Sequence, residues 1–217
     1  MTRQEGWVAV TQRRVRFPAR GEEGDYLDAR WMPLLADHRV VLVPGDLGAA
    51  RRLLDGLELA AIVLSGGNDV PGAPGAADLA PERDAVEHWL LERAEQNETT
   101  TVVGICRGAQ VLAARAGARL AEDAPRHAGT RHEVHAVAPA SWGWPDTFTV
   151  ASHHRHALPA DGLPAGLRVL AVADGGATVE AFTYERLPWW GLMWHPEREA
   201  PPGPATRALA RLLDATT

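Results

Sequence analysis

The sequence predicts a three-layer α/β fold, with a mostly parallel central sheet, helices on both faces and a small antiparallel β section in the second half. Up to residue 120, short apolar runs alternate with segments of helical periodicity, which is typical of a parallel sheet. Beyond residue 120, apolar runs follow one another without helices between them. The 217 residues suffice for one large core, so we expect a single domain over residues 1–217.

The first half of the chain supplies strands and helices in alternation. The apolar residues between 26 and 35 recur at helical spacing, whereas the charged, glycine-containing stretch 14–24 is expected to be a loop. Pro81 suits the first turn of a longer helix. The expected strands lie at 7–10, 40–43, 60–64 and 100–105, and the expected helices at 26–35, 47–57, 81–96 and 111–120.

The second half is dominated by runs that favour strands. Asp174, Gly175 and Gly176 form a turn between two of these runs. Trp142 and Trp144 stand in a loop that contains glycine and proline, and we expect their rings to pack into the body of the protein. The expected strands lie at 132–137, 147–150, 168–172, 178–184 and 190–194, and a helix at 205–213 closes the pattern.

The composition argues against several classes of function. The formal net charge of −6 argues against a nucleic-acid partner. All 22 basic residues are arginine, so the chain offers no lysine for a Schiff base or a Walker-type phosphate site. No apolar run reaches the length of a membrane span, and no signal-peptide pattern opens the sequence. We therefore expect a cytoplasmic protein with neither nucleic-acid nor membrane partners.

The only cysteine, Cys106, stands at a predicted strand-to-helix corner. Gly104 and Gly108 lie two residues to either side, where they permit a tight bend and close packing of strand and helix. Such a corner exposes a side chain above a parallel sheet, and the N-terminus of the following helix favours a thiolate. A buried structural cysteine is the alternative, but the Gly-x-Cys-x-Gly spacing favours a nucleophile.

A thiolate nucleophile needs a general base, and His195 fits that role. It follows an apolar strand, and α/β sheets place their chemistry at strand ends. Glu197 lies two residues further on, where it can orient the imidazole and favour its charged form. A histidine satisfied within the core is the alternative for His195 alone. Together with the cysteine corner, the pattern favours a catalytic triad.

Two further patterns carry weaker signals. Gly66 and Gly67 follow a predicted strand, where they let a backbone N–H point at a ligand atom. Ordinary loops also use glycine, but beside the cysteine corner this loop is the natural second donor for an oxyanion. Six histidines gather between residues 127 and 156, yet their spacings match no strong zinc signature and acidic partners are sparse. We therefore expect no metal site and no cofactor.

These motifs and Ser152-His153-His154 resemble, in the family's order, the class I glutamine amidotransferase-like superfamily, in particular its small stand-alone γ-glutamyl hydrolases of the peptidase C26 type. The resemblance covers most of the chain. It implies a flavodoxin-like three-layer fold and a cysteine-dependent hydrolase of amide bonds. It also implies roles for the matching residues: a triad of Cys106, His195 and Glu197, an oxyanion hole from the N–H groups of Gly67 and Arg107, and substrate contacts at Gly66, Gln110, His153 and His154.

The implied reaction is attack of the thiolate on a γ-carboxamide carbon, followed by hydrolysis of a γ-glutamyl thioester to glutamate. The sequence around Arg107 looks like that of stand-alone γ-glutamyl-amide hydrolases. The stretches 9–13, 27–31 and 64–69 are similar to small members that include hydrolases of nucleotidyl-phosphoryl glutamine, which release a phosphoramidate. An N-substituted glutamine is therefore the preferred small-molecule substrate, and the abundant arginines suit an anionic leaving group.

Two other functions stay open at this point. A glutaminase subunit would deliver ammonia to a separate synthetase partner, although the chain carries no recognisable ATP-binding motif of its own. A non-catalytic member would bind a ligand on a decayed site, which the intact Cys106, His195 and Glu197 argue against. Stacking of one of the Trp142 and Trp144 rings on the distal part of the substrate is the alternative to their packing in the body.

Overall fold

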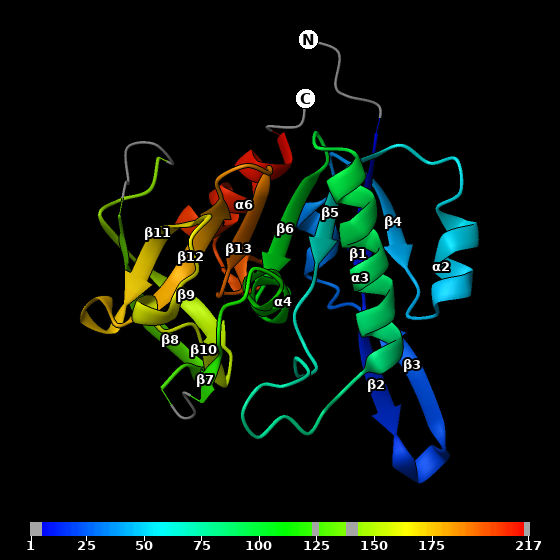
Figure 1. Ribbon diagram of the computed structural model, residues 1–217, viewed down its shortest axis with the longest axis horizontal. Helices are drawn as coiled ribbons and strands as arrows, with labels where there is room; N and C mark the ends of the chain where they lie inside the picture. Colours follow the sequence, from blue (N-terminus) through cyan, green and yellow to red (C-terminus); the bar gives the residue numbers. More distant parts are fainter. Residues whose placement is uncertain (1–5, 123–125, 138–142, 215–217) are drawn as a thin grey trace.

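The computed structural model describes residues 6–122, 126–137 and 143–214, and it has the three-layer α/β fold that the sequence predicts (Figure 1). Within these residues, one nine-stranded sheet runs through the molecule, with five parallel strands followed by four antiparallel ones. In spatial order the strands are β4 (Arg39–Val43), β1 (Trp7–Thr11), β5 (Leu59–Leu64), β6 (Thr101–Ile105), β13 (Trp189–Leu192), β12 (Thr178–Tyr184), β11 (Leu167–Ala173), β8 (Ala128–Ala136) and β9 (Thr147–His153).

Strand β13 joins the two halves of the sheet. It pairs in parallel with β6 on one side and antiparallel with β12 on the other. Leu192 lies opposite Ile105 in this register, so the two parallel strands end side by side. The residues that follow these strands, Cys106 and 193–195, therefore lie at one carboxyl edge, where α/β sheets place their binding sites.

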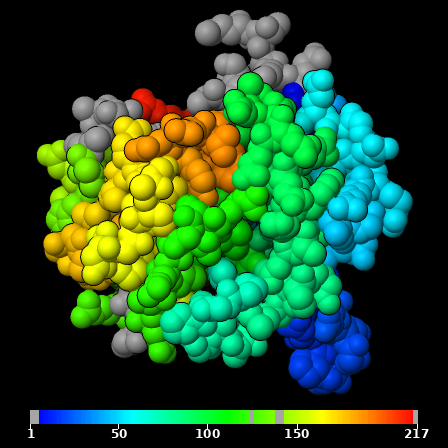
Figure 2. Space-filling view, viewed as in Figure 1, coloured from blue at the N-terminus to red at the C-terminus, as the bar shows by residue number. Residues whose placement is uncertain are grey.

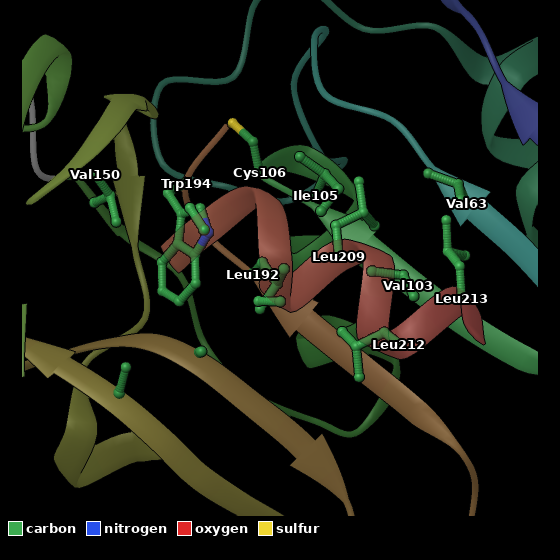
Figure 3. Close-up of a cluster of buried hydrophobic side chains, with 14 of the residues drawn as sticks. Val63, Val103, Ile105, Cys106, Val150, Leu192, Trp194, Leu209, Leu212 and Leu213 are labelled. Carbon is green, nitrogen blue, oxygen red and sulfur yellow. The ribbon is translucent and has the colours of Figure 1, made fainter. Parts of the chain in front are cut away.

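Helices cover both faces of the sheet, and each face has its own apolar cluster. On one face, the first cluster contains Leu90 and Leu112, which lie on two of the covering helices. On the other face, Leu209 and Leu212 pack near Trp194 in the second cluster (Figure 3). The first group of helices is α2 (Leu47–Leu53), α3 (Pro81–Gln96) and α4 (Arg107–Arg115), and the second is α1 (Trp31–Leu34) and α6 (Pro204–Asp214).

The stretch 14–24, expected to be a loop, lies instead in a β-hairpin. Strand β2 (Arg13–Phe17) pairs antiparallel with β3 (Glu22–Tyr26). The charged residues are compatible with strands because they pair across the ladder, as Arg16 does with Glu23 (Nε–Oε1 3.1 Å). They also suit the position of the hairpin, which projects from the body of the molecule (Figures 1 and 2).

The helix expected at 26–35 is also shorter than predicted, because only Trp31–Leu34 is helical. Tyr26 completes strand β3, and the side chain of Asp28 then accepts a hydrogen bond from the backbone N–H of Arg30 (3.0 Å). Such local side-chain bonds compete with helix formation. The result is a turn that carries Asp28 and Arg30 to the edge of the sheet where the strands end.

Two short strands, β7 (Ala121–Glu122) and β10 (His156–Ala157), form a small separate sheet beside α4 (Figure 1). The second of them keeps the chain that follows β9 close to the carboxyl edge of the main sheet. In the described ranges, no helix combines the length and the low polarity that crossing a bilayer would require.

Candidate active site

Cys106 occupies a sharp corner between β6 and α4, which begins directly after it rather than at residue 111 as expected. Its φ of +52° and ψ of −105° are strained for a non-glycine residue, as in a nucleophile elbow. The flanking glycines are required: a Cβ at Gly104 would lie 2.4 Å from the backbone of Gly108, and one at Gly108 would lie 2.1 Å from the Leu64 carbonyl oxygen. The corner directs the sulfur away from the apolar side chains packed beneath it (Figure 3).

His195 follows β13 and reaches the same place as Cys106. Its Nδ1 atom lies 2.6 Å from Oε1 of Glu197, and both side chains are buried. A Cβ added to Gly66 would lie 2.8 Å from Cε1 of His195 and 3.5 Å from Cβ of Cys106, so both side chains lie against this glycine. The structure thus brings the predicted nucleophile, base and orienting carboxylate together from opposite ends of the chain.

The thiol and the imidazole shift each other's pKa values in opposite directions. Burial raises the pKa of Cys106, but the positive charge of His195 and a hydrogen bond with it, together with the charge of His154, outweigh burial and lower the pKa. Burial lowers the pKa of His195, but the Cys106 thiolate and Glu197 raise it to about 10. Among the described residues, the buried Nε2 of His195 has no hydrogen-bond partner in standard geometry, as is common for a catalytic base before substrate binds.

The predicted oxyanion donors, Gly67 and Arg107, line the same cavity as Cys106. Gly67 has φ of +86°, which strains any other residue, and a Cβ there would lie 2.9 Å from the side chain of Arg13. The N–H of Arg107 belongs to the first turn of α4, where N–H groups have no partner within the helix. This placement is compatible with donation to an oxyanion, and that role stays a prediction.

A buried arginine that sequence reasoning missed holds the Gly66–Gly67 loop in place. The side chain of Arg83, on α3, is 1% exposed and its charge is balanced by Glu87 (Nε–Oε1 2.8 Å). It donates to three successive carbonyl groups, those of Ser65 (2.6 Å), Gly66 (3.2 Å) and Gly67 (2.6 Å). Because a carbonyl and the following N–H share one peptide plane, these bonds also orient the N–H groups of the loop.

The same cluster of charges anchors the residue after the nucleophile. The guanidinium of Arg107 binds the carboxylates of Asp84 and Glu87. Glu87 also accepts a hydrogen bond from the Thr11 hydroxyl (2.8 Å), whose oxygen accepts the N–H of Ser65 (3.2 Å). Burial raises the pKa of Glu87, but the charges of Arg107 and Arg83 outweigh it and lower the net value. One turn of α3 therefore supports both predicted oxyanion donors.

A sequence signal for this cluster does exist. Arg83 and Glu87 are four residues apart, and they share the buried side of α3 with Val86 and Leu90. A charged pair at i and i+4 within an apolar stripe indicates a buried ion pair rather than a solvated one.

Two of the predicted substrate-binding side chains are held by neighbours within the protein. The side-chain amide of Gln110 donates to the carbonyl of His156 (2.9 Å), which links α4 to β10. His154 is buried and lies with Nε2 3.5 Å from a carboxylate oxygen of Glu180. Both residues line the cavity, and their contacts with substrate stay predictions.

His153 lies beside the catalytic pair. Its Nε2 accepts a hydrogen bond from Arg198 (2.9 Å), and its ring stands edge-on to that of His195, with centroids 5.5 Å apart. Burial, followed by the charges of Arg198 and His195, lowers the pKa of His153 to about 4. His153 is therefore neutral at neutral pH and lines the cavity as an uncharged side chain next to His195, the predicted general base.

All of the predicted site residues line one cavity of about 690 Å³. Asp69 and Asp78 also line it, as does Asp28, which pairs with Arg30 (Nη2–Oδ2 2.6 Å). The Nε atom of Arg13 is buried and has no hydrogen-bond partner among the described residues. Apart from the anchored Arg107, the arginines that line the cavity are Arg13, Arg30, Arg155 and Arg198.

Trp144, in the loop that contains glycine and proline, does not line this cavity. That ring is buried and packs against Phe148 and Trp194, with centroids 5.6 Å and 5.7 Å away. It therefore packs into the body as expected, and this position rules out its stacking on a ligand in the cavity. Trp142 lies outside the described residues.

Comparisons with known proteins agree with this geometry. The Peptidase C26 family model matches residues 10–197. The γ-glutamyl-CDP-amidate hydrolase of Campylobacter jejuni is 33% identical over 140 residues, which cover 64% of this chain and 62% of that protein. The carbamoyl phosphate synthase small chain of Symbiobacterium thermophilum is 30% identical over 165 residues, or 76% of this chain and 40% of that protein. The matched region is thus less than two thirds of either relative.

A solved structure extends the comparison to the fold. A glutamine amidotransferase from Thermotoga maritima superimposes with a TM-score of 0.70, covers 98% of each chain and is 17% identical. Since the family model runs from β1 through the Cys106 corner to Glu197, this chain belongs to the Peptidase C26 family, and it shares the fold of the glutamine amidotransferase.

Proposed function

We propose that this protein is a hydrolase that uses Cys106 to cleave the γ-amide of an N-substituted glutamine whose leaving amine carries a phosphoryl group, as in a nucleotidyl-phosphoryl glutamine. The products are glutamate and a phosphoramidate. The observation that carries the proposal is the set of arginines that line the same cavity of about 690 Å³ as Cys106. Guanidinium groups bind phosphate oxygens in a bidentate manner, and a cavity of this size holds more than a single amino acid.

The chemical steps follow from the geometry of the triad. The Cys106 thiolate attacks the γ-carbon, and the N–H groups of Gly67 and Arg107 stabilise the tetrahedral oxyanion. Protonated His195 gives its proton to the departing nitrogen, so the amine leaves neutral and a γ-glutamyl thioester remains. His195 then takes a proton from water, which attacks the thioester carbonyl and releases glutamate and the thiolate. Glu197 keeps Nδ1 of the imidazole oriented throughout.

The arginines that line the cavity support a role in binding the leaving group. Arg13 adjoins the Gly67 loop, and Arg155 and Arg198 come from the segments that follow β9 and β13. They thus reach the cavity that contains Cys106 from three separate segments. The relative that is named a γ-glutamyl-CDP-amidate hydrolase supports the same substrate class, since its name describes a γ-glutamyl group on a phosphoryl amide nitrogen.

A panel of γ-glutamyl amides tests the proposal, with glutamate release as the readout. The panel contains glutamine, γ-glutamyl ethylamide, N-phosphoryl glutamine and a nucleotidyl-phosphoryl glutamine. We expect kcat/KM for the phosphorylated amides to exceed that for glutamine by about tenfold or more, because one charged hydrogen bond contributes about 1.5–3 kcal/mol. Equal or higher kcat/KM for glutamine would refute the substrate class.

Matched variants separate the substrate class from the nucleophile. Arg155→Gln and Arg13→Gln should lower kcat/KM for phosphorylated amides by about tenfold and leave that for γ-glutamyl ethylamide nearly unchanged. Arg168→Gln, on the exposed side of β11, is the control and should change neither. Cys106→Ala should abolish hydrolysis of every amide, and retained activity would show that the nucleophile is misassigned.

The second candidate is a glutaminase that supplies ammonia to a synthetase partner. The relative named as a carbamoyl phosphate synthase small chain favours it, since that protein is one chain of a larger synthase. This function predicts that glutamine is the best substrate of the panel and that free ammonia appears together with glutamate. The substrate panel therefore decides between the two candidates.

A further inference from the structure

A group of histidines surrounds one buried carboxylate behind the active-site cavity. Glu180, on β12, is 0% exposed. His132 comes from β8, His127 directly precedes that strand, and His154 directly follows β9. Donor atoms of His127, His132 and Glu180 all lie within 4.8 Å of one another. The sequence-based expectation of no metal site used spacing along the chain, which says nothing about ligands that come from different strands.

The distances within this cluster differ from those of direct ion pairs. Carboxylate oxygens of Glu180 lie 3.4 Å from Nε2 of His132, 3.5 Å from Nε2 of His154 and 3.8 Å from Nδ1 of His127. A charge-assisted hydrogen bond between nitrogen and oxygen would measure about 2.7–2.9 Å. Two ligands on one tetrahedral zinc ion, with bonds of about 2.0–2.1 Å, lie roughly 3.3–3.4 Å apart. The distance between Glu180 and His132 is close to this separation of two zinc ligands.

The surroundings of His127 supply a second, independent observation. Its Nδ1 faces Glu180, while its Nε2 lies 3.5 Å from Oδ2 of Asp174. Metal-bound histidines commonly present their other ring nitrogen to a carboxylate, which fixes the tautomer and the ring orientation. The ring of His127 also stacks on that of His132, with centroids 4.1 Å apart.

We propose that His127, His132 and Glu180 form a structural site for a divalent transition-metal ion, Zn²⁺ in the first place. Two imidazoles and one carboxylate, with a water molecule in the fourth position, are a donor set that zinc accepts, and the cation would neutralise the buried charge of Glu180. The ion would bind β8 and β12 to one another behind the residues that line the cavity. This site is separate from the amide-hydrolysis chemistry and does not depend on the identity of the substrate.

The test uses the full chain in a Cys106→Ala background, which removes the thiol as a competing metal ligand. After treatment with a chelator, the protein is titrated with Zn²⁺ by calorimetry and with Co²⁺ by visible absorption. We expect one ion per chain and the strong visible bands of four-coordinate Co²⁺. At a Zn²⁺ concentration about 100-fold above Kd, Tm should rise by about 5–10 °C.

Three second-site variants identify the ligands. Glu180→Gln and His132→Gln should weaken Zn²⁺ binding by about tenfold or more and remove the Co²⁺ bands. His135→Gln is the matched control, because His135 is a half-exposed histidine on the same strand, β8. Failure of the Cys106→Ala protein to bind either ion, or equal binding by the Glu180→Gln and His135→Gln proteins, would overturn the proposal. If Glu180→Gln fails to fold, His132→Gln and the Tm rise of the Cys106→Ala protein decide the outcome.

Discussion

The imidazole of His195 lies between a thiol and a carboxylate, and both neighbours favour its protonated form. The net pKa of Cys106 is lowered and that of His195 is raised to about 10, so the thiolate–imidazolium pair exists between the two values. Within that range the nucleophile is ionised and the acid for the leaving amine carries its proton. At the residue scale, the proposed mechanism therefore depends on mutual stabilisation of two charges.

This arrangement predicts the pH dependence of amide hydrolysis. kcat/KM should rise with pH to a plateau reached below the ordinary thiol pKa of about 8.5, and it should fall again near pH 10 as the imidazolium loses its proton. In Glu197→Gln the falling limb should move to lower pH, because Glu197 is one of the groups that raise the pKa of His195. Initial rates between pH 5 and 11 measure both limbs.

The control for this experiment is Glu133→Gln, which removes an exposed carboxylate on β8 and should leave both limbs in place. A falling limb at the same pH in Glu197→Gln and in the unmodified enzyme would mean that His195 does not titrate in the catalytic range as the geometry indicates.

At the scale of elements, α3 holds the Gly66–Gly67 loop in place. Arg83 binds the carbonyls that precede and include Gly67, and Asp84 and Glu87 bind the side chain of Arg107. Removing one oxyanion donor outright costs about 10²–10³ in rate, so loosening a donor should cost less than that. Among the described residues, the hydrogen-bond partners of Arg83 include neither Cys106 nor His195, so we expect its effect on catalysis to be one of positioning.

Arg83→Lys tests this role while it keeps the positive charge. Lysine cannot reproduce the fork of bonds to three carbonyls, so we expect kcat to fall by about tenfold to a hundredfold with KM little changed. Arg93→Lys is the matched control: Arg93 lies on the same helix and donates to the carbonyls of Leu54 and Leu57, away from the site. Equal kcat losses in the two variants, or a loss of stability without a change in kcat, would show that Arg83 only supports the fold.

Element by element, the sequence predicts what local patterns can determine. The helix at 81–96 and the corner at Cys106 were predicted because proline, glycine and apolar periodicity are local signals. The hairpin β2–β3 was missed because its cross-strand charge pairs look like a solvated loop until the partner strand is known. Arg83 was missed for a similar reason, since burial of a charged side chain depends on the loop that covers it.

The whole molecule brings together what the sequence separates. Strand β13 lies between β6 and β12, and that order arises from pairing between distant segments, which periodicity cannot reveal. The resemblance of motifs placed Cys106 and His195 in one site, and the structure shows why they meet. The parallel half supplies the thiol and both predicted oxyanion donors, while the antiparallel half supplies His153 and the buried Glu180 cluster.

Continuity of the sheet and of both cores predicts that residues 6–214 unfold as one unit. One apolar cluster contains Val103 from the parallel half and Val150 from the antiparallel half, and the other likewise contains Ile62 and Val179. Since neither half can unfold without exposing the other's core, urea transitions followed by tryptophan fluorescence, far-UV circular dichroism and amide hydrolysis should coincide. Two separated transitions would contradict a single domain.

Substitution of Leu192, on β13, tests whether the two halves unfold together. The side chain is fully buried where the two halves join, so Leu192→Ala should lower the free energy of unfolding by about 2–5 kcal/mol and shift the fluorescence and circular dichroism transitions together. Leu42→Ala on the edge strand β4, where the side chain is 39% exposed, should change it by less than about 0.5 kcal/mol. Destabilisation by Leu192→Ala of only one transition would mean that β13 joins two independently folding parts, because a continuous core transmits the loss to both.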